Sequence, residues 1–99
     1  MEYRRLPKGT EQISVLGFGG SSIHQAGEKE GVDTITAAME HGINYFDMAG
    51  PEAVAFDYYR TAFAGNRNWV YLQMHFGADY SSGKYGWTTD LNRIKRGMD

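Results

Sequence analysis

Residues 42–47 read Gly42-Ile43-Asn44-Tyr45-Phe46-Asp47 and lie in an apolar and aromatic run, Ile43–Ala49, that is short enough for one buried strand. From Glu28 onward, apolar residues recur with the 3.6-residue period of an amphipathic helix. Gly42 stands where a glycine commonly ends such a helix. The sequence therefore predicts a helix that ends near Gly42 and passes directly into a buried strand.

The same pair of elements is expected on both sides of this stretch. Pro51 suits the first turn of a helix, and Gly65 ends the apolar stripe that follows it. Gly77–Thr88 is rich in glycine, serine and tyrosine and is predicted to be a loop. The expected order is strand Val15–Gly20, helix Glu28–Met39, strand Ile43–Ala49, helix Pro51–Gly65, strand Trp69–Phe76 and a third helix from Thr89 or Asp90, with Leu91, Ile94 and Met98 on its face.

Alternating strands and helices with short links are typical of βα units around a parallel sheet, so we predict an α/β fold. An open doubly wound sheet and a closed barrel both satisfy this pattern. Tyr3–Leu6 and Gln12–Leu16 are predicted to form a hairpin around a turn of breaker residues. We therefore expect one domain, with a hairpin over residues 1–16 and three βα units over residues 17–99.

Composition indicates a folded protein without a polyanionic partner. The 41% hydrophobic and 14% aromatic residues supply a core and argue against a disordered segment. The net charge is −2 with acidic and basic residues interspersed, which leaves no positive surface for nucleic acid or an anionic membrane. The basic cluster Arg93, Lys95 and Arg96 is interpreted as the cover of a helix end. We expect neither nucleic acid nor a membrane as a partner.

Cysteine is absent, which excludes disulfides, a thiol nucleophile and an iron–sulfur cluster within these residues. Met1–Arg5 is charged where a secretory signal is apolar, and no apolar run approaches the ~18 residues that a membrane span needs. We therefore expect a cytoplasmic protein whose chemistry uses His, Asp, Glu, Lys or Tyr.

Ionisable side chains follow the predicted strands. Because the ends of parallel strands meet on one face, Asp47 and His75 are expected to lie together, with Glu52 just beyond Asp47. A carboxylate beside a histidine raises the proton affinity of the imidazole, and Glu52 or a nearby tyrosine is a candidate proton donor to a carbonyl oxygen. The alternative is a structural ion pair that locks two strands.

Two further interpretations concern the same edge. Gly17-Phe18-Gly19 lacks the third glycine of a dinucleotide fingerprint, because position 22 is Ser22. Gly19 and Gly20 instead ease a tight strand end and leave room beside the site, and they are our candidate cofactor-binding residues. His24 is interpreted as an ordinary polar loop residue. No metal site is predicted, because the chain has no His-x-His or Glu-x-x-His pair.

Three segments resemble the opening of a known family in order and spacing. They are Tyr3-Arg4-Arg5-Leu6, Ile13-Ser14-Val15-Leu16-Gly17-Phe18-Gly19-Gly20 and Gly42-Ile43-Asn44-Tyr45-Phe46-Asp47. The family is that of the aldo-keto reductases. His75–Tyr80 is similar to its bacterial branch, whose full-length members often carry a C-terminal iron–sulfur region.

The resemblance implies that the chain is the N-terminal third of a (β/α)₈ barrel whose hairpin closes the bottom. It also implies carbonyl reduction with NADPH by an Asp, Tyr, Lys and His tetrad. Asp47 matches the tetrad aspartate, whereas Glu52 stands at the tyrosine position and His75 at the lysine position. The tetrad histidine and most of the nucleotide site fall beyond Asp99. The resemblance therefore implies an altered reductase with Asp47, Glu52 and His75 as catalytic candidates and a small carbonyl compound as substrate.

A closed barrel needs roughly 250 residues, so the 99-residue chain alone is expected to be inactive and to self-associate through its open sheet edge. Two alternatives to the oxidoreductase stay open. One is a non-catalytic, self-associating partial barrel. The other is a metal-dependent hydrolase or isomerase that uses Asp47 and His75 with Glu52 or His24.

Overall fold

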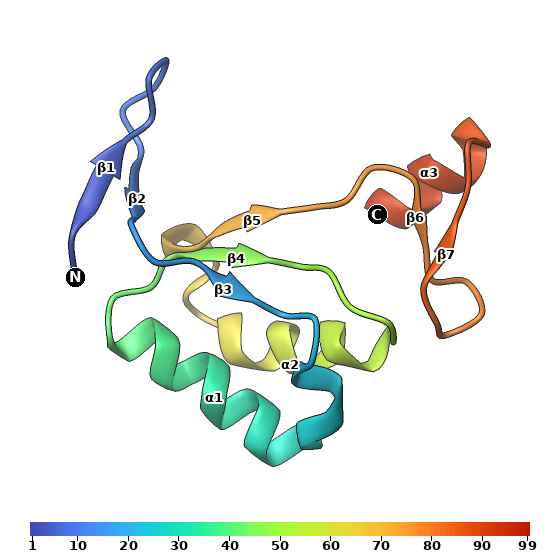
Figure 1. Ribbon diagram of the computed structural model, residues 1–99, viewed down its shortest axis with the longest axis horizontal. Helices are drawn as coiled ribbons and strands as arrows, with labels where there is room; N and C mark the ends of the chain where they lie inside the picture. The colour runs from blue at the N-terminus through green and yellow to red at the C-terminus, as the bar shows by residue number, and fades with distance from the viewer.

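The computed structural model describes all residues from Met1 to Asp99 (Figure 1). The chain is a mixed α/β structure with three small sheets and three α-helices. The elements in order are β1 (Tyr3–Arg5), β2 (Gln12–Ser14), β3 (Phe18–Gly19), the 3₁₀ helix η1 (Ile23–Ala26), α1 (Glu28–Glu40), β4 (Tyr45–Asp47), α2 (Val54–Phe63), the 3₁₀ helix η2 (Arg67–Trp69), β5 (Tyr71–Gln73), β6 (Ala78–Asp79), β7 (Gly86–Trp87) and α3 (Leu91–Met98).

The central sheet is parallel and has the order β3-β4-β5. Phe18, Phe46 and Leu72 are neighbours across its three strands and pack against the helical core. Helices α1 and α2 lie side by side on this face of the sheet (Figure 1). Side chains alternate along a strand, so the row Gly19, Asp47 and Gln73 belongs to the opposite face. The predicted parallel α/β arrangement is confirmed.

Helix α1 begins and ends where the sequence predicts. Its end is a Schellman motif, because Gly42 N–H donates to Met39 O at 2.9 Å and Ile43 N–H donates to Ala38 O at 3.0 Å. Gly42 has φ +93°, a conformation that favours glycine. This turn reverses the chain and delivers it directly into β4.

Aromatic side chains from α2 and β4 form the centre of the core. Phe46 is fully buried, and its ring lies 5.0 Å from that of Phe63 at 68°. Tyr59 contacts both rings, with centroids 6.4 Å from Phe46 and 5.5 Å from Phe63. Edge-to-face packing of this kind adds to the free energy gained by burial alone. The core therefore fixes β4 against α2 at the residue before Asp47.

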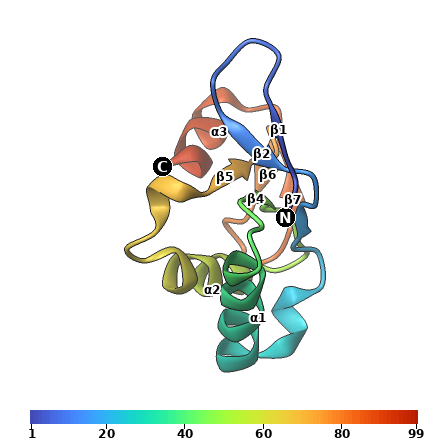
Figure 2. The ribbon, with the colours of Figure 1, turned by 90° about the vertical axis from the view of Figure 1, so that its left-hand side faces the viewer.

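The N-terminal hairpin β1–β2 is antiparallel, as predicted, and is attached to the start of β4. The buried side chain of Asn44 accepts a hydrogen bond from Ser14 N–H at 2.8 Å and donates one to Gln12 O at 2.8 Å. Tyr3 donates to Gly42 O at 2.8 Å. Figure 2 shows the hairpin and the helices α1 and α2 on opposite sides of the parallel sheet. The hairpin thus lies at the end of β4 that is remote from Asp47.

The segment Gly77–Thr88 departs from the prediction of a plain loop. It holds the short antiparallel pair β6–β7, in which Ala78 faces Trp87 and Asp79 faces Gly86. Helix α3 packs on β6 instead of joining α1 and α2 beneath the sheet (Figure 1). The prediction of a simple third βα unit was therefore wrong in this detail, because a hairpin intervenes and carries the helix with it.

Candidate functional site

Asp47 and His75 form a hydrogen-bonded pair at the carboxyl ends of the parallel strands. Asp47 is the last residue of β4, and His75 follows two residues after β5 ends. The distance from His75 Nε2 to Asp47 Oδ1 is 2.7 Å. Both side chains are accessible, at 41% for His75 and 36% for Asp47. The predicted contact between these two residues is confirmed, and solvent reaches both groups.

The pair leaves one nitrogen of the imidazole available. When Nε2 carries the hydrogen that it donates to the Asp47 carboxylate, Nδ1 of neutral His75 is an acceptor. No protein group hydrogen-bonds to Nδ1 of His75 in the structure. A histidine held by a carboxylate through one nitrogen transfers protons through the other. The arrangement therefore has the form of a general acid–base pair.

Glu52 is not part of this pair. Its backbone forms a β-bridge with Lys84, and the neighbouring Ala53 N–H donates to Gly83 O at 2.8 Å. No hydrogen bond or ion pair links the Glu52 carboxylate to Asp47 or His75. The structure thus brings together two of the three predicted catalytic residues, and Glu52 is tied by its main chain to the turn between β6 and β7.

Gly19 and Gly20 differ in their surroundings. Gly20 N–H donates to Asp47 O at 3.2 Å, and a Cβ on Gly20 would collide with the hydroxyl of Tyr59. A Cβ on Gly19 would have no heavy atom within 4 Å. Gly20 therefore makes room for a core tyrosine, whereas Gly19 borders open space in the same row as Asp47.

Tyr59 lies beneath the carboxyl ends of the parallel strands, close to Gly20 and Asp47. It is 2% exposed, and its hydroxyl has no hydrogen-bond partner. Burial and, to a lesser extent, the negative charge of Asp47 together raise the pKa of Tyr59 to about 12. Sequence reasoning missed Tyr59 as a neighbour of this edge, because its contact with Gly20 joins residues 39 positions apart in the chain.

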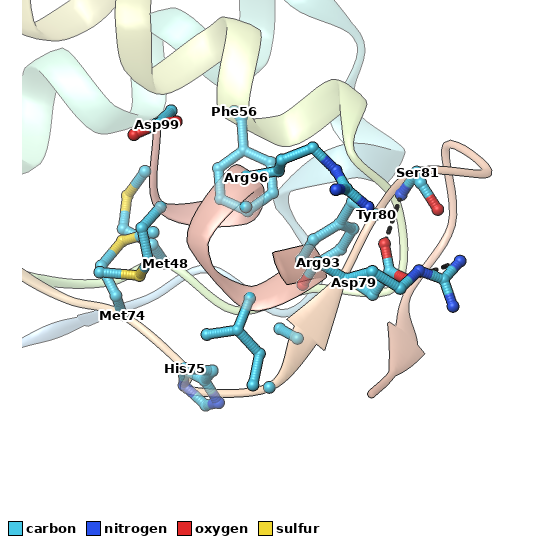
Figure 3. A pocket seen from close by; sticks show the side chains of 15 residues that line it. Met48, Phe56, Met74, His75, Asp79, Tyr80, Ser81, Arg93, Arg96 and Asp99 are labelled. Carbon is cyan, nitrogen blue, oxygen red and sulfur yellow. Dashed lines mark hydrogen bonds and ion pairs between the residues drawn. The ribbon is translucent and has the colours of Figure 1, made fainter. Parts of the chain in front are cut away.

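A cavity of about 510 Å³ opens beside His75, between the strand ends, the β6 segment and α3 (Figure 3). Apolar side chains of Met48, Phe56 and Met74 line it from the sheet and α2, and Met98 lines it from α3. Its volume lies within the range of about 300 to 1,000 Å³ that is typical of small-molecule sites. The cavity was not predicted, because it depends on the packing of α3 against the β6–β7 hairpin.

Asp79 and Arg93 occupy the side of the cavity away from Met48 and Met74, whereas Asp99 lies nearer to these methionines (Figure 3). Arg93 Nη2 lies 3.2 Å from Asp79 Oδ2, and Ser81 N–H donates to Asp79 Oδ1 at 3.0 Å. The pKa of Asp79 is lowered, first by the hydrogen bonds from Ser81 and then by the charges of Arg93 and Arg96. Arg96 lies in the last turn of α3, as predicted, but Arg93 and Arg96 also line this cavity.

The candidate metal ligands do not form a cluster in the structure. His24 lies in η1, and its Nδ1 atom is buried without a hydrogen-bond partner. No group of three or more His, Asp or Glu side chains is arranged to hold a metal ion. The second alternative, a metal-dependent hydrolase or isomerase, therefore gains no geometric support from Asp47, His75, Glu52 and His24.

Helices of this structure are shorter and more polar than a bilayer span requires, and the longest, α1, has 13 residues. Comparisons with protein-family models, with curated proteins and with solved structures find no match to this chain. The resemblance of residues 3–6, 13–20 and 42–47 to the aldo-keto reductases therefore stays a prediction from the sequence.

Proposed function

We propose that this chain forms the N-terminal part of an aldo-keto reductase-like (β/α)₈ barrel, a cytoplasmic oxidoreductase that reduces a small carbonyl compound with NADPH. The observation that carries the proposal is the 2.7 Å hydrogen bond between His75 and Asp47 at the carboxyl ends of parallel strands. Active sites of (β/α)₈ barrels are built at this end. Asp47 is also the position that matches the family's aspartate.

The arrangement of the remaining elements supports the barrel. The three strands are neighbours in sequence order, and α1 and α2 lie on one face of the sheet, as outer helices of a barrel do. Asn44 fastens the N-terminal hairpin at the other end of β4, where a hairpin would close the bottom of a barrel. The face that carries Asp47 is then the inner face of the barrel.

Carbonyl reduction needs a hydride at the carbon and a proton at the oxygen. NADPH, when bound, supplies the hydride and leaves as NADP⁺. We assign the proton to protonated His75, which would donate it from Nδ1 while Asp47 accepts the hydrogen bond from Nε2. Solvent then reprotonates His75, which is 41% exposed. The carboxylate of Asp47 stabilises the imidazolium that this step requires.

The residues present fit one end of the cofactor. Open space above Gly19, in register with Asp47, leaves room for a planar ring close to the backbone. Gly20 contributes indirectly to the shape of this strand end, because the absence of a side chain leaves space for the hydroxyl of Tyr59. We therefore propose that Gly19 contacts the nicotinamide directly and that Gly20 only shapes the strand end. Glu52 stays a candidate proton donor only if the turn between β6 and β7 moves, because its main chain is paired with Lys84.

The proposal is tested by following NADPH oxidation, with a panel of aldehydes and ketones, by the full-length protein of which this chain is proposed to be the N-terminal part. Asp47→Asn should lower kcat/KM by about 10² to 10⁴-fold, the usual contribution of acid–base catalysis, and His75→Gln should have a similar effect. Glu40→Gln, an exposed change on α1, is the matched control and should retain full activity. Absence of further βα units in the extended reading frame, or of carbonyl-dependent NADPH oxidation by the full-length wild-type protein, would refute the proposal.

A second candidate function is a non-catalytic, self-associating partial barrel, and one observation favours it. The parallel sheet has only three strands, so β3 and β5 each present an unpaired edge. Phe76, just beyond β5, is 78% exposed. Parallel sheets are ordinarily covered on both faces. Oligomers in light scattering together with unaltered assembly of Asp47→Asn would support this function.

A further inference from the structure

We infer that the cavity beside His75 binds an uncharged small molecule with a planar, apolar body, held between an aromatic wall and a wall of methionines. That this ligand is the substrate rests on the proposed function. The binding itself follows from the shape, the charge and the lining of the cavity, and it can be measured without any turnover.

The aromatic wall is rigid. The rings of Phe56 and Tyr80 meet edge to face, with centroids 4.9 Å apart at 83°. The hydroxyl of Tyr80 donates to Gly50 O at 2.7 Å and accepts from Gly50 N–H at 3.3 Å. The ring of Tyr85 supports Tyr80 from another side at 5.8 Å. Fixed ring faces and edges of this kind favour flat apolar ligands over globular ones.

The methionine wall is adaptable. Met48, Met74 and Met98 line the cavity, whereas Met1 and Met39 do not. Figure 3 shows the side chains of Met48 and Met74 on the side away from Asp79 and Tyr80. Thioether side chains adjust to an apolar ligand and contact aromatic ring edges favourably. Met48 is buried at 8% exposure, while Met98 is 60% exposed at the mouth of the cavity.

The charges around the cavity select against ionic ligands. Two cations, Arg93 and Arg96, line the cavity together with two carboxylates, Asp79 and Asp99. Arg93 is already paired with Asp79 at 3.2 Å, and hydrogen bonds from Ser81 keep that carboxylate ionised. An anion would meet the carboxylates of Asp79 and Asp99, and a cation would meet the guanidinium groups of Arg93 and Arg96. A neutral ligand avoids both penalties, and it can accept a hydrogen bond from Nδ1 of His75 when that imidazole is protonated.

The test uses protein labelled with ¹³C at the methionine methyl groups, titrated with acetophenone, benzoate and benzylamine. These probes share one ring and differ in charge. We expect saturable shifts of the Met48, Met74 and Met98 signals with acetophenone and unmoved signals from Met1 and Met39. Benzoate and benzylamine should bind at least about tenfold more weakly, a difference of about 1.4 kcal/mol.

Two variants sharpen the result. Met98→Ala, an exposed position, should weaken acetophenone binding several-fold without unfolding the protein, whereas Met39→Leu on α1 should leave it unchanged. Equal shifts at all five methyl groups, or benzoate binding as tight as that of acetophenone, would overturn the inference. Binding without NADPH-dependent reduction by the full-length protein would contradict only the proposed function, and reduction without shifts of the cavity methyls would contradict only this inference.

Discussion

At the scale of single residues, Gly19 and Gly20 give the clearest contrast. A methyl group on Gly20 would collide with the hydroxyl of Tyr59, whereas one on Gly19 would enter open space. Overpacking of a core costs typically about 1 to 3 kcal/mol. We therefore predict that Gly20→Ala lowers the free energy of urea unfolding by that amount and that Gly19→Ala leaves it nearly unchanged.

The double variant Gly20→Ala/Tyr59→Phe tests the cause. Removal of the hydroxyl takes away the atom nearest to the new methyl group, so part of the lost stability should return. If the two changes destabilise additively, the contact between Gly20 and Tyr59 does not explain the requirement for glycine.

Tyr59 predicts a pH dependence of stability. Its pKa is about 12 in the folded protein, and a tyrosine in the unfolded chain titrates near pH 10. The unfolded state therefore loses its proton first as the pH rises. The stabilisation that comes from the raised pKa of Tyr59 is therefore fully present below about pH 10. Between about pH 10 and pH 12, the free energy of unfolding falls by roughly 2 to 3 kcal/mol.

Other groups titrate in the same range, so the variant Tyr59→Phe isolates this effect in urea unfolding at several pH values. It should flatten the decline above pH 10 and, near neutral pH, leave stability equal or higher, because the hydroxyl is buried without a partner. Tyr85→Phe is the matched control, since Tyr85 is 52% exposed and should keep the wild-type slope. If the stability of Tyr59→Phe falls above pH 10 as steeply as that of the wild-type protein, other residues cause the decline.

At the scale of elements, Asn44 joins the hairpin to the sheet. Its side chain bonds both Ser14 N–H and Gln12 O, and it is 5% exposed. Asn44→Ala leaves these backbone groups without partners, which should cost about 2 to 4 kcal/mol for the two lost bonds. We predict faster hydrogen exchange in β1 and β2, while α1 and α2 keep their protection.

Asn68→Ala is the control for this prediction. Asn68 lies in η2, is exposed and forms no side-chain hydrogen bond. Exchange throughout the hairpin should therefore match that of the wild-type protein. Equal acceleration in both variants would show that the hairpin is not held by Asn44.

Elements with local signals were predictable from the sequence, and those formed by tertiary packing were not. The periodic apolar residues of α1 and the glycine at position 42 carry their structure in a short window. The pairing of β6 with β7 joins strands of two residues each, too short for a pattern of alternation. The helix α3 was predicted as an element, but its place on β6 was not.

The candidate site shows the same division. Asp47 and His75 were expected to meet, because parallel strands in register bring their ends together. Glu52 was expected beside them from its place in the chain, but the main-chain pairing with Lys84 ties it to the β6–β7 turn. Tyr59 and the methionine-lined cavity arise only once the helices are packed, so no short stretch of sequence indicates them.

At the scale of the whole molecule, the open sheet decides how the chain behaves in solution. Only 16 of 99 residues are buried, and the sheet ends at β3 on one side and β5 on the other. An uncovered strand edge is a template for pairing with another chain. We predict concentration-dependent association of the purified 99-residue chain, measured as molecular mass by light scattering over a dilution series.

A positive charge introduced on the outer edge strand β5 tests whether this edge mediates the association. Gln73 is exposed on β5, and a lysine on an edge strand is a common means by which proteins prevent pairing. Gln73→Lys should weaken association about tenfold or more. The free energy of unfolding should fall by no more than about 1.5 kcal/mol, because the change removes the exposed hydrogen bond that Gln73 Oε1 accepts from Tyr45. Asn68→Lys adds the same charge outside the strand and should associate like the wild-type chain. Equal weakening by both variants would indicate general charge repulsion, and a monomer at every concentration would show that the open edge is protected in some other way.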